Sequence, residues 1–328
     1  MKNFRCDCGQ ILFFENTLCL SCGNQVGFDP SASKMYSIAE SDQQPKHQLC
    51  KNSIDYNVCN WFVTDSISAY CVSCRLNHTI PNLLRPERRR WWKSLERAKR
   101  RLIYSLISLK LPILGKAADP KGLAFSFIED QRTNPAVFEK HVLTGHNDGH
   151  ITVNIAEADT VNREKTRAFT GESYRTLLGH LRHESGHYYF SILINNNELL
   201  QQFRELFGDE TADYDAALKH YYANKKSIAH DSTMISHYAQ SHPQEDWAEV
   251  WSHYLHMVDT LDTAAEFDDE LGSSQLDDFE ETLNKWSRLA IMLNALNRSM
   301  GLEDAYPFVL SELTLKKLRF IHGLICPN

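Results

Sequence analysis

Hydrophobic residues recur at helical spacing over most of the chain, and two long helices stand out. After Pro86 the pattern predicts an amphipathic helix whose apolar face carries Trp92, Leu95, Leu102, Leu106 and Leu109. A second helix is predicted over residues 172–192, rich in leucine and aromatic residues, and it should end before the three consecutive asparagines at 195–197. The chain from residue 113 onward is therefore expected to be mixed at first and then mainly helical.

One strand and a third helix complete this pattern. Residues 150–158 alternate in polarity and contain β-branched residues, so they predict a strand that is entered through the turn GHNDG. A helix should begin near Ser241, because Ser241 and Gln244 fit a capping box and Pro243 would fall in the first turn. Acid-rich residues 259–281 are expected to form a solvated loop and helix face.

Composition and charge narrow the class of protein. The chain has 328 residues, of which 42% are hydrophobic, enough for one large core and a small additional domain. Its 35 basic and 42 acidic residues give a net charge of −7, so we expect neither nucleic acid nor an anionic membrane as a partner. The N-terminus reaches cysteines before any apolar stretch of signal-peptide length. The longest later apolar stretch, from Leu102, is broken by Lys110 and Pro112 and is shorter than the about 20 residues that span a bilayer. We expect a cytoplasmic protein; its oligomeric state is not predicted.

Eight of the nine cysteines lie before residue 75, and Cys326 stands alone near the end. Such clustering in a reducing compartment indicates metal sites rather than disulfides. Four thiolates complete a tetrahedron around zinc, which makes such sites structural, and the spacings resemble those of zinc ribbons. We favour two sequential groups over a crossed, ring-like pairing. The two groups are Cys6, Cys8, Cys19 and Cys22, followed by Cys50, Cys59, Cys71 and Cys74.

The predicted helix after Pro86 carries nine basic residues between Arg85 and Arg101. They could form an arm that binds RNA or an acidic partner, or they could form the solvated face of a helix whose apolar stripe is docked. We favour the solvated face, since the apolar stripe requires a partner and runs of basic residues are commonly solvated.

The segment HESGH within the second predicted helix has the HExxH pattern of zinc enzymes. His183 and His187, four residues apart, would project from one helix face and could share one zinc ion, while Glu184 would act as general base on a water molecule. A helix with two surface histidines is the alternative. We favour zinc, because the surrounding residues are those of a buried helix and Gly186 would allow another backbone to approach closely.

A catalytic zinc needs a third protein ligand, and Glu245 and Glu249 lie on one face of the third predicted helix. The segment resembles gluzincins, above all the anthrax lethal factor type, with a tyrosine seven residues before the ligand glutamate. This resemblance implies Glu245 as ligand, Glu249 as the residue that orients a ligating histidine, and Tyr238 as oxyanion donor. Asp246 departs from that pattern, which has an aromatic residue there. Other candidate ligands are Glu249, His242, His253 and His256, and His180 is expected to be a packing or supporting residue.

At larger scale the chain resembles a bacterial family of zinc-binding metallopeptidases with an N-terminal zinc ribbon. The segments that carry this resemblance are GHNDGHITVNIAEAD, YRTLLGHLRHESGHYY, HPQEDWAEVWSHYLHMVDTL and LNALNRSMGLEDAYPFVL. The resemblance implies a gluzincin-like peptidase. With the cysteine clustering and the basic helix, we expect an α+β fold with a double zinc-ribbon domain (1–80), a basic amphipathic linker helix (81–112) and a mainly helical, zincin-like catalytic domain (113–328). Zincins bind substrate along an edge strand, and residues 150–158 are the candidate for that strand.

The expected activity is zinc-dependent hydrolysis of a peptide or protein substrate, with one catalytic and two structural zinc ions. Two alternatives remain open at this point. The chain could be a zinc-organised module that binds nucleic acid or protein, with a silent HExxH site. It could also be a zinc hydrolase that acts on an amide other than a peptide.

Overall fold

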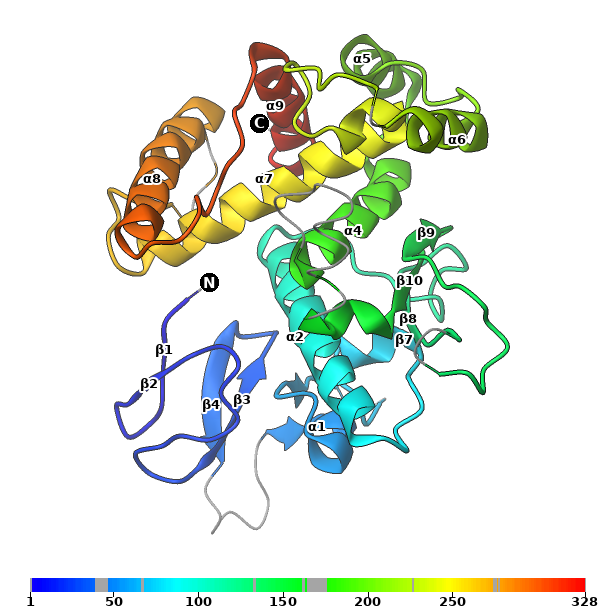
Figure 1. The fold of residues 1–328 in the computed structure, drawn as a ribbon. Coiled ribbons are helices and arrows are strands. Elements are labelled where there is room, and N and C mark those ends of the chain that lie inside the picture. The colour runs from blue at the N-terminus through cyan, green and yellow to red at the C-terminus, as the bar shows by residue number, and fades with distance from the viewer. Residues whose placement is uncertain are drawn as a thin grey trace. The chain divides into compact units, whose positions relative to one another are not determined.

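The structure is a computed structural model that describes residues 2–38, 47–65, 68–131, 134–160, 163, 176–225, 227–273, 276 and 278–327. The chain divides into two compact units, Met1–Leu181 and Arg182–Asn328. Short strands and one long helix make up most of the first unit, and helices make up most of the second (Figure 1). The predicted α+β class, with a cysteine-rich region followed by a mainly helical one, is confirmed.

The cysteine-rich region consists of three small antiparallel pairs of strands. These pairs are β1 (Phe4–Arg5) with β2 (Ile11–Leu12), β3 (Gln25–Asp29) with β4 (Lys34–Ile38), and β5 (Gln48–Leu49) with β6 (Phe62–Val63). A short helix, α1 (Lys51–Tyr56), follows β5, and a 3-10 turn, η1 (Cys74–Leu76), ends the region. Its core is aromatic: the rings of Phe14, Phe28 and Trp61 pack in sequence, with centroids 5.0 Å apart for Phe14–Phe28 and for Phe28–Trp61.

Helix α2 (Pro86–Ser108) begins at the predicted proline and packs against this aromatic core. The Tyr104 ring on α2 lies 5.3 Å from that of Phe14. Four residues of the predicted apolar face are buried, whereas Leu109 is partly exposed and follows the helix as its C-cap. The expectation that the basic residues of α2 are solvated is wrong for three of them. Arg88, Lys99 and Arg100 are buried, since the helix is covered on more of its circumference than the apolar stripe alone.

A four-stranded sheet follows in the first unit, in the order β7 (Asn77–Thr79), β8 (Ala124–Ile128), β10 (His150–Asn154) and β9 (Gly145–Asn147). The strand predicted over residues 150–158 is shorter than expected. It ends at Asn154 as β10, and the residues that follow form a 3-10 turn, η2 (Ile155–Ala158). The expectation that it is an edge strand is wrong: β10 pairs with β8 on one side and with β9 on the other. The GHNDG segment contributes the edge strand itself, and Asp148 and Gly149 form its hairpin turn with positive φ.

The second unit is built from helices. They are α4 (Leu177–Leu193), which spans the boundary between the units, α5 (Asn197–Phe207), α6 (Tyr214–Asn224), α7 (Pro243–Ala265), α8 (Phe279–Ser299) and α9 (Glu312–Ile325). The asparagine triplet ends α4 as predicted and also starts the next helix, because Asn196 accepts a hydrogen bond from the Leu199 N–H as its N-cap. The predicted residues 172–175 lie outside the described residues. Within the part of the chain that is described, no helix is long and apolar enough to cross a bilayer.

Helix α7 lies beside α5, α8 and α9 (Figure 1). It begins at Pro243, but the predicted capping box is wrong. The N-cap is His242, whose Nδ1 accepts a hydrogen bond of 3.1 Å from the Gln244 N–H. Ser241 instead ends a 3-10 turn, η3 (Tyr238–Ser241), where its hydroxyl donates to the Tyr238 carbonyl. The proline still occupies the first turn, where its missing N–H costs nothing.

Helices α4 and α7 approach each other very closely at Gly186. A Cβ atom on Gly186 would lie 2.9 Å from the Ala248 Cα and 3.1 Å from the Trp251 Cδ1. The indole N–H of Trp247 donates to the Gly186 carbonyl at 2.8 Å, and that of Trp251 donates to the Ser185 hydroxyl at 3.1 Å. The predicted role of Gly186 is confirmed: it allows another backbone to approach the segment between the two histidines.

We expect Gly186→Ala to lower the free energy of unfolding by roughly 1–3 kcal/mol, because the added methyl group would overlap the α7 backbone. Gly323→Ala is the matched control: Gly323 is also helical and exposed, and a Cβ there would meet no atom within 4 Å. Removing backbone freedom at that site should raise stability by about 0.5–1 kcal/mol. Denaturant unfolding at a fixed zinc concentration measures both, and a stabilising Gly186→Ala would contradict the close contact.

Candidate metal centres

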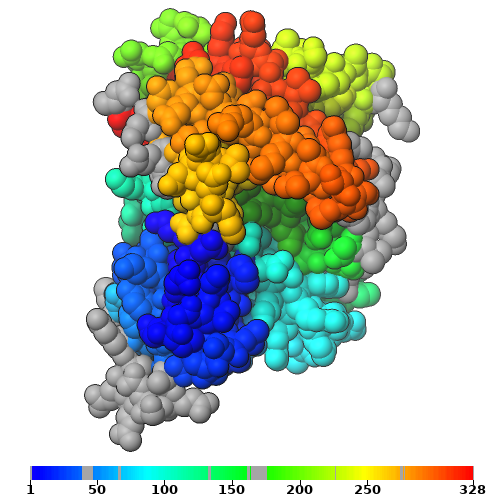
Figure 2. Space-filling view, turned by 90° about the vertical axis from the view of Figure 1, so that its left-hand side faces the viewer, coloured from blue at the N-terminus to red at the C-terminus, as the bar shows by residue number. Residues whose placement is uncertain are grey.

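Among the residues that the structure describes, three groups of side chains offer potential metal ligands, and within each group the ligand atoms lie within 4.8 Å of one another. The first is the ribbon quartet nearest the N-terminus, in which Cys6 Sγ lies 3.7 Å from Cys22 Sγ and Cys8 Sγ lies 3.6 Å from Cys19 Sγ. A tetrahedron with Zn–S bonds of about 2.3 Å has edges of about 3.8 Å, so these sulfurs fit zinc. They are too far apart for disulfides. Cys8 and Cys22 are exposed, and part of the first ribbon, in blue, lies on the molecular face shown in Figure 2.

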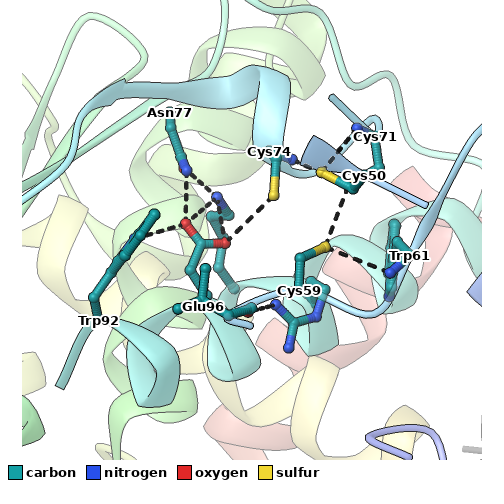
Figure 3. Close-up of polar contacts among 11 residues, drawn as sticks. Cys50, Cys59, Trp61, Cys71, Cys74, Asn77, Trp92 and Glu96 are labelled. Carbon is teal, nitrogen blue, oxygen red and sulfur yellow. Dashed lines mark hydrogen bonds and ion pairs between the residues drawn. The ribbon is translucent and has the colours of Figure 1, made fainter. Parts of the chain in front are cut away.

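The second quartet is Cys50, Cys59, Cys71 and Cys74, and all four cysteines are buried (Figure 3). Cys59 Sγ and Cys71 Sγ are 3.7 Å apart, again close to the edge of a zinc tetrahedron. Backbone N–H groups point at the sulfurs: Trp61 N–H lies 3.4 Å from Cys59 Sγ, and Cys74 N–H lies 3.4 Å from Cys71 Sγ. In each quartet the four cysteines are consecutive along the chain, as the favoured prediction had it. The sulfur atoms are not grouped in the crossed, ring-like pairing.

The third group joins His183 and His187 of α4 to Glu245 of α7. The two imidazole centroids are 5.1 Å apart on one face of the helix. Glu245 Oε2 lies 2.9 Å from His183 Nε2, and Glu245 Oε1 lies 3.5 Å from His187 Nε2. Zinc bonds of about 2.0 Å to nitrogen and oxygen imply ligand separations of about 3.3 Å, so this donor set also fits zinc.

Glu249 contacts the other nitrogen of the same histidine. Its Oε1 lies 2.7 Å from His183 Nδ1, one turn along α7 from Glu245. Such a contact holds the proton on Nδ1 and leaves the Nε2 lone pair directed at the Glu245 side of the site. The two glutamates therefore occupy different positions around one imidazole, and only Glu245 approaches both histidines.

Electrostatics favour a cation at this position. Burial raises the pKa of Glu245, but hydrogen bonding and charge from His183 and His187 lower it by more, to about 2. Burial lowers the pKa of His183, while its hydrogen bonds to Glu245 and Glu249 raise it well above the usual range. A proton and a divalent cation thus compete for the same nitrogen, which two carboxylates make strongly attractive to positive charge.

Tyr238 lies beside the site on η3, with its ring centroid 5.9 Å from that of His183. The sequence analysis missed a second tyrosine: Tyr214, the first residue of α6, donates its hydroxyl to Glu245 Oε1. Burial, together with the charge of Glu245, raises the pKa of both phenols, so they keep their protons. Glu184 is buried, and its charge also raises the pKa of Tyr214.

The alternative histidine ligands have other partners. His242 caps α7 through Nδ1 and lies 3.1 Å from the Ala212 carbonyl through Nε2. His253 Nδ1 lies 3.2 Å from the Tyr306 hydroxyl, and burial lowers the pKa of His253 to about 4. His256 packs against the Trp286 ring, with centroids 5.7 Å apart. Among the described residues, none of the three belongs to a group of potential metal ligands.

His180 and Asp246 have roles that only the structure reveals. His180, in the first unit, lies with its Nδ1 2.6 Å from Glu157 Oε2. Asp246, the departure from the lethal factor type of pattern, forms a fully buried ion pair with Lys317 of α9. The acidic residue therefore fits its position because a buried cation from another helix compensates its charge.

Comparison with known families agrees with this arrangement. Residues 88–324 match the family described as "Putative zinc-binding metallo-peptidase", and residues 3–85 match a zinc-ribbon domain. The chain belongs to this metallo-peptidase family. The resemblance inferred from the sequence is thereby confirmed, including the N-terminal zinc ribbon.

Relatives that align with nearly the whole chain occur in mycobacteria. Uncharacterized proteins of Mycobacterium tuberculosis and Mycobacterium bovis are 43% identical over 339 residues, covering 99% of this chain and 95% of theirs. No solved structure matches the chain. The similarity therefore extends over both the ribbon region and the helical region.

Glu245→Gln and Glu249→Gln should weaken zinc binding at the helix site to different degrees. Glu245→Gln removes a ligand carboxylate and should abolish retention of one zinc ion. Glu249→Gln removes the carboxylate that contacts His183 Nδ1 and should weaken zinc affinity at this site by about 10- to 100-fold. Zinc per chain, measured by elemental analysis across a chelator titration, checks this. Glu205→Gln, an exposed change on α5, is the control. Equal behaviour of the two variants would show that their positions do not distinguish ligand from supporting residue.

Proposed function

We propose that the protein is a zinc-dependent metallopeptidase of the gluzincin type, with His183, His187 and Glu245 as zinc ligands. The observation that carries this proposal is the convergence of the HExxH histidines with Glu245 from a second helix. Glu249 orients His183 through Nδ1, which supports the same division of roles. Membership of the metallo-peptidase family supports hydrolysis rather than a silent metal site.

Zinc at this site would polarise a peptide carbonyl and increase the acidity of water. Glu184 is the general base: it follows the first ligand histidine, is buried, and takes the proton of the attacking water before passing it to the leaving amine. Tyr238 donates its hydroxyl to the oxyanion that forms on the carbonyl. Tyr214, bonded to Glu245 Oε1, fixes the ligand carboxylate.

The two cysteine quartets would each hold one structural zinc, giving three zinc ions per chain with the catalytic one. Eight cysteines arranged as metal sites fit a reducing compartment, and we propose a cytoplasmic location. The substrate class is a peptide or protein. The net charge of −7 gives no support to a nucleic-acid partner.

Glu184→Gln should retain three zinc ions and lose activity by roughly 10²–10⁴-fold, because the amide cannot accept the proton. A proteome-derived peptide mixture, with cleavage products read by mass spectrometry, supplies the assay without a known substrate. His183→Ala is the control for the metal and should retain only two zinc ions. Full activity of Glu184→Gln would show that Glu184 is not the general base. Cleavage of small amides with no cleavage of peptides would point to a different substrate class.

Tyr238→Phe and Tyr214→Phe should separate the two tyrosines. Loss of an oxyanion donor lowers kcat by about 10²–10³-fold with little change in KM, and we expect this for Tyr238→Phe. Tyr214→Phe should instead weaken zinc retention, as the loss of a group that holds a ligand carboxylate does. Kinetics at saturating zinc and chelator titrations measure the two effects, and reversed phenotypes would exchange the two roles.

A further inference from the structure

Helix α2 carries three buried charged side chains, and two of them, Glu96 and Arg100, lie next to the second cysteine quartet. Glu96 and Lys99 are 0% exposed and Arg100 is 5% exposed, although all three belong to the basic helix predicted to have a solvated face. Glu96 lies beside Cys74 in the close-up of Figure 3, and Arg100 donates a hydrogen bond to the carbonyl of Val58, the residue before Cys59. Charges buried this deeply require compensation, since desolvation costs several kcal/mol per ion.

Glu96 is compensated within the helix. Lys99 Nζ lies 3.0 Å from Glu96 Oε2 and 3.1 Å from Oε1, and Oε1 also accepts hydrogen bonds from Asn77 Nδ2 at 2.7 Å and Trp92 Nε1 at 3.0 Å. The pair of Glu96 and Lys99 therefore has no net charge. Its carboxylate nevertheless faces the quartet, with Oε2 3.9 Å from Cys74 Sγ.

Arg100 has no such partner. Its Nη1 donates to the Val58 carbonyl at 2.6 Å, directly before Cys59. Among the described residues, no carboxylate oxygen lies within 4.0 Å of its guanidinium nitrogens. Burial lowers the pKa of Arg100, but negative charge on Cys59, Glu96, Cys74 and Cys71 raises it by more. Of these negative groups, Cys59 raises the pKa of Arg100 the most, and Glu96, which comes next, is already paired with Lys99.

Zinc bound at the second quartet would give the cysteines a net negative charge beside Arg100. Four thiolates and one Zn²⁺ carry a formal charge of −2, whereas four thiols carry none, so Arg100 would be an uncompensated buried cation without the metal. We propose that Arg100 is the counter-charge of the second zinc site and that it couples zinc occupancy there to the stability of α2. This inference rests on zinc at the Cys50 quartet and is independent of the peptidase assignment.

The coupling joins two parts of the chain that match different families. The quartet lies in the segment that matches the zinc ribbon, whereas Arg100 lies in the segment that matches the metallo-peptidase family. The neighbouring Arg101 forms an ion pair with Glu15 of the first ribbon, and Tyr104 packs on Phe14. The zinc ions of the ribbons would thus stabilise the first helix of the metallo-peptidase segment.

Site-resolved cysteine alkylation in the full-length protein tests this proposal. Thiols protected by zinc react slowly, so peptide mass spectrometry after timed alkylation in chelator reports zinc loss at each quartet separately. Arg100→Gln should increase the alkylation rate of the second quartet by about 10- to 100-fold, the range found for residues that support metal ligands, and leave the first quartet unchanged. Arg97→Gln, an exposed arginine on the same helix, is the matched control and should change neither.

Arg100→Lys keeps the charge and changes the shape, so it should protect the second quartet far better than Arg100→Gln does. Hydrogen exchange of the wild-type protein supplies an independent measurement: chelator should remove protection from residues 86–108. Unchanged alkylation in Arg100→Gln, equal loss from Lys and Gln, or α2 protection that survives removal of zinc would each overturn the proposal. Loss of zinc at the helix site alone would concern the proposed peptidase and leave this inference intact.

Discussion

The close approach of α4 and α7 at Gly186 is the constraint on which the helix site depends. Two helices with ordinary side chains at their crossing lie 8–10 Å apart. Here a missing Cβ lets the Ala248 backbone come within van der Waals contact, and two indole N–H groups bond to residues of α4. At this separation the Glu245 carboxylate lies 2.9 Å from His183 Nε2 and 3.5 Å from His187 Nε2. The residue between the two histidines is thus as important to the site as the histidines themselves.

The helix site and the second cysteine quartet share one physical feature. In both, ionisable side chains are buried, and the charges of a bound metal site would compensate them. At the helix site two carboxylates surround a single imidazole. At the second quartet the buried Arg100 guanidinium donates to the carbonyl directly before Cys59. The ribbons have few aliphatic residues and a small aromatic core, so metal binding must contribute much of their folding free energy. Polar groups that would be costly in an ordinary core are retained here because they are parts of ion sites.

The clearest local signals in the sequence predicted the elements and ligand groups well. Pro86 and Pro243 each begin a helix, and the asparagines at 195–197 end one and start another. The spacing of HExxH placed His183 and His187 on one face, because 3.6 residues per turn brings positions four apart together. Where prediction failed, long-range pairing decided the outcome. Whether residues 150–154 lie at an edge depends on β9 and β8, and their pairing is not encoded in the strand's own alternation.

The sequence by itself predicted three of the long helices, grouped the cysteines and histidines into sets of possible metal ligands, and carried the resemblance to the metallo-peptidase family. These properties depend on residues close in sequence, or on a motif long enough to be read directly. Tertiary structure alone decided the partners of single side chains: Tyr214 on Glu245, Lys317 on Asp246, and Arg100 beside the buried cysteines. Such contacts join residues tens of positions apart. A charged or phenolic side chain has the same sequence signature whether it faces solvent or a buried ion site, so only the packing of the helices distinguishes the two.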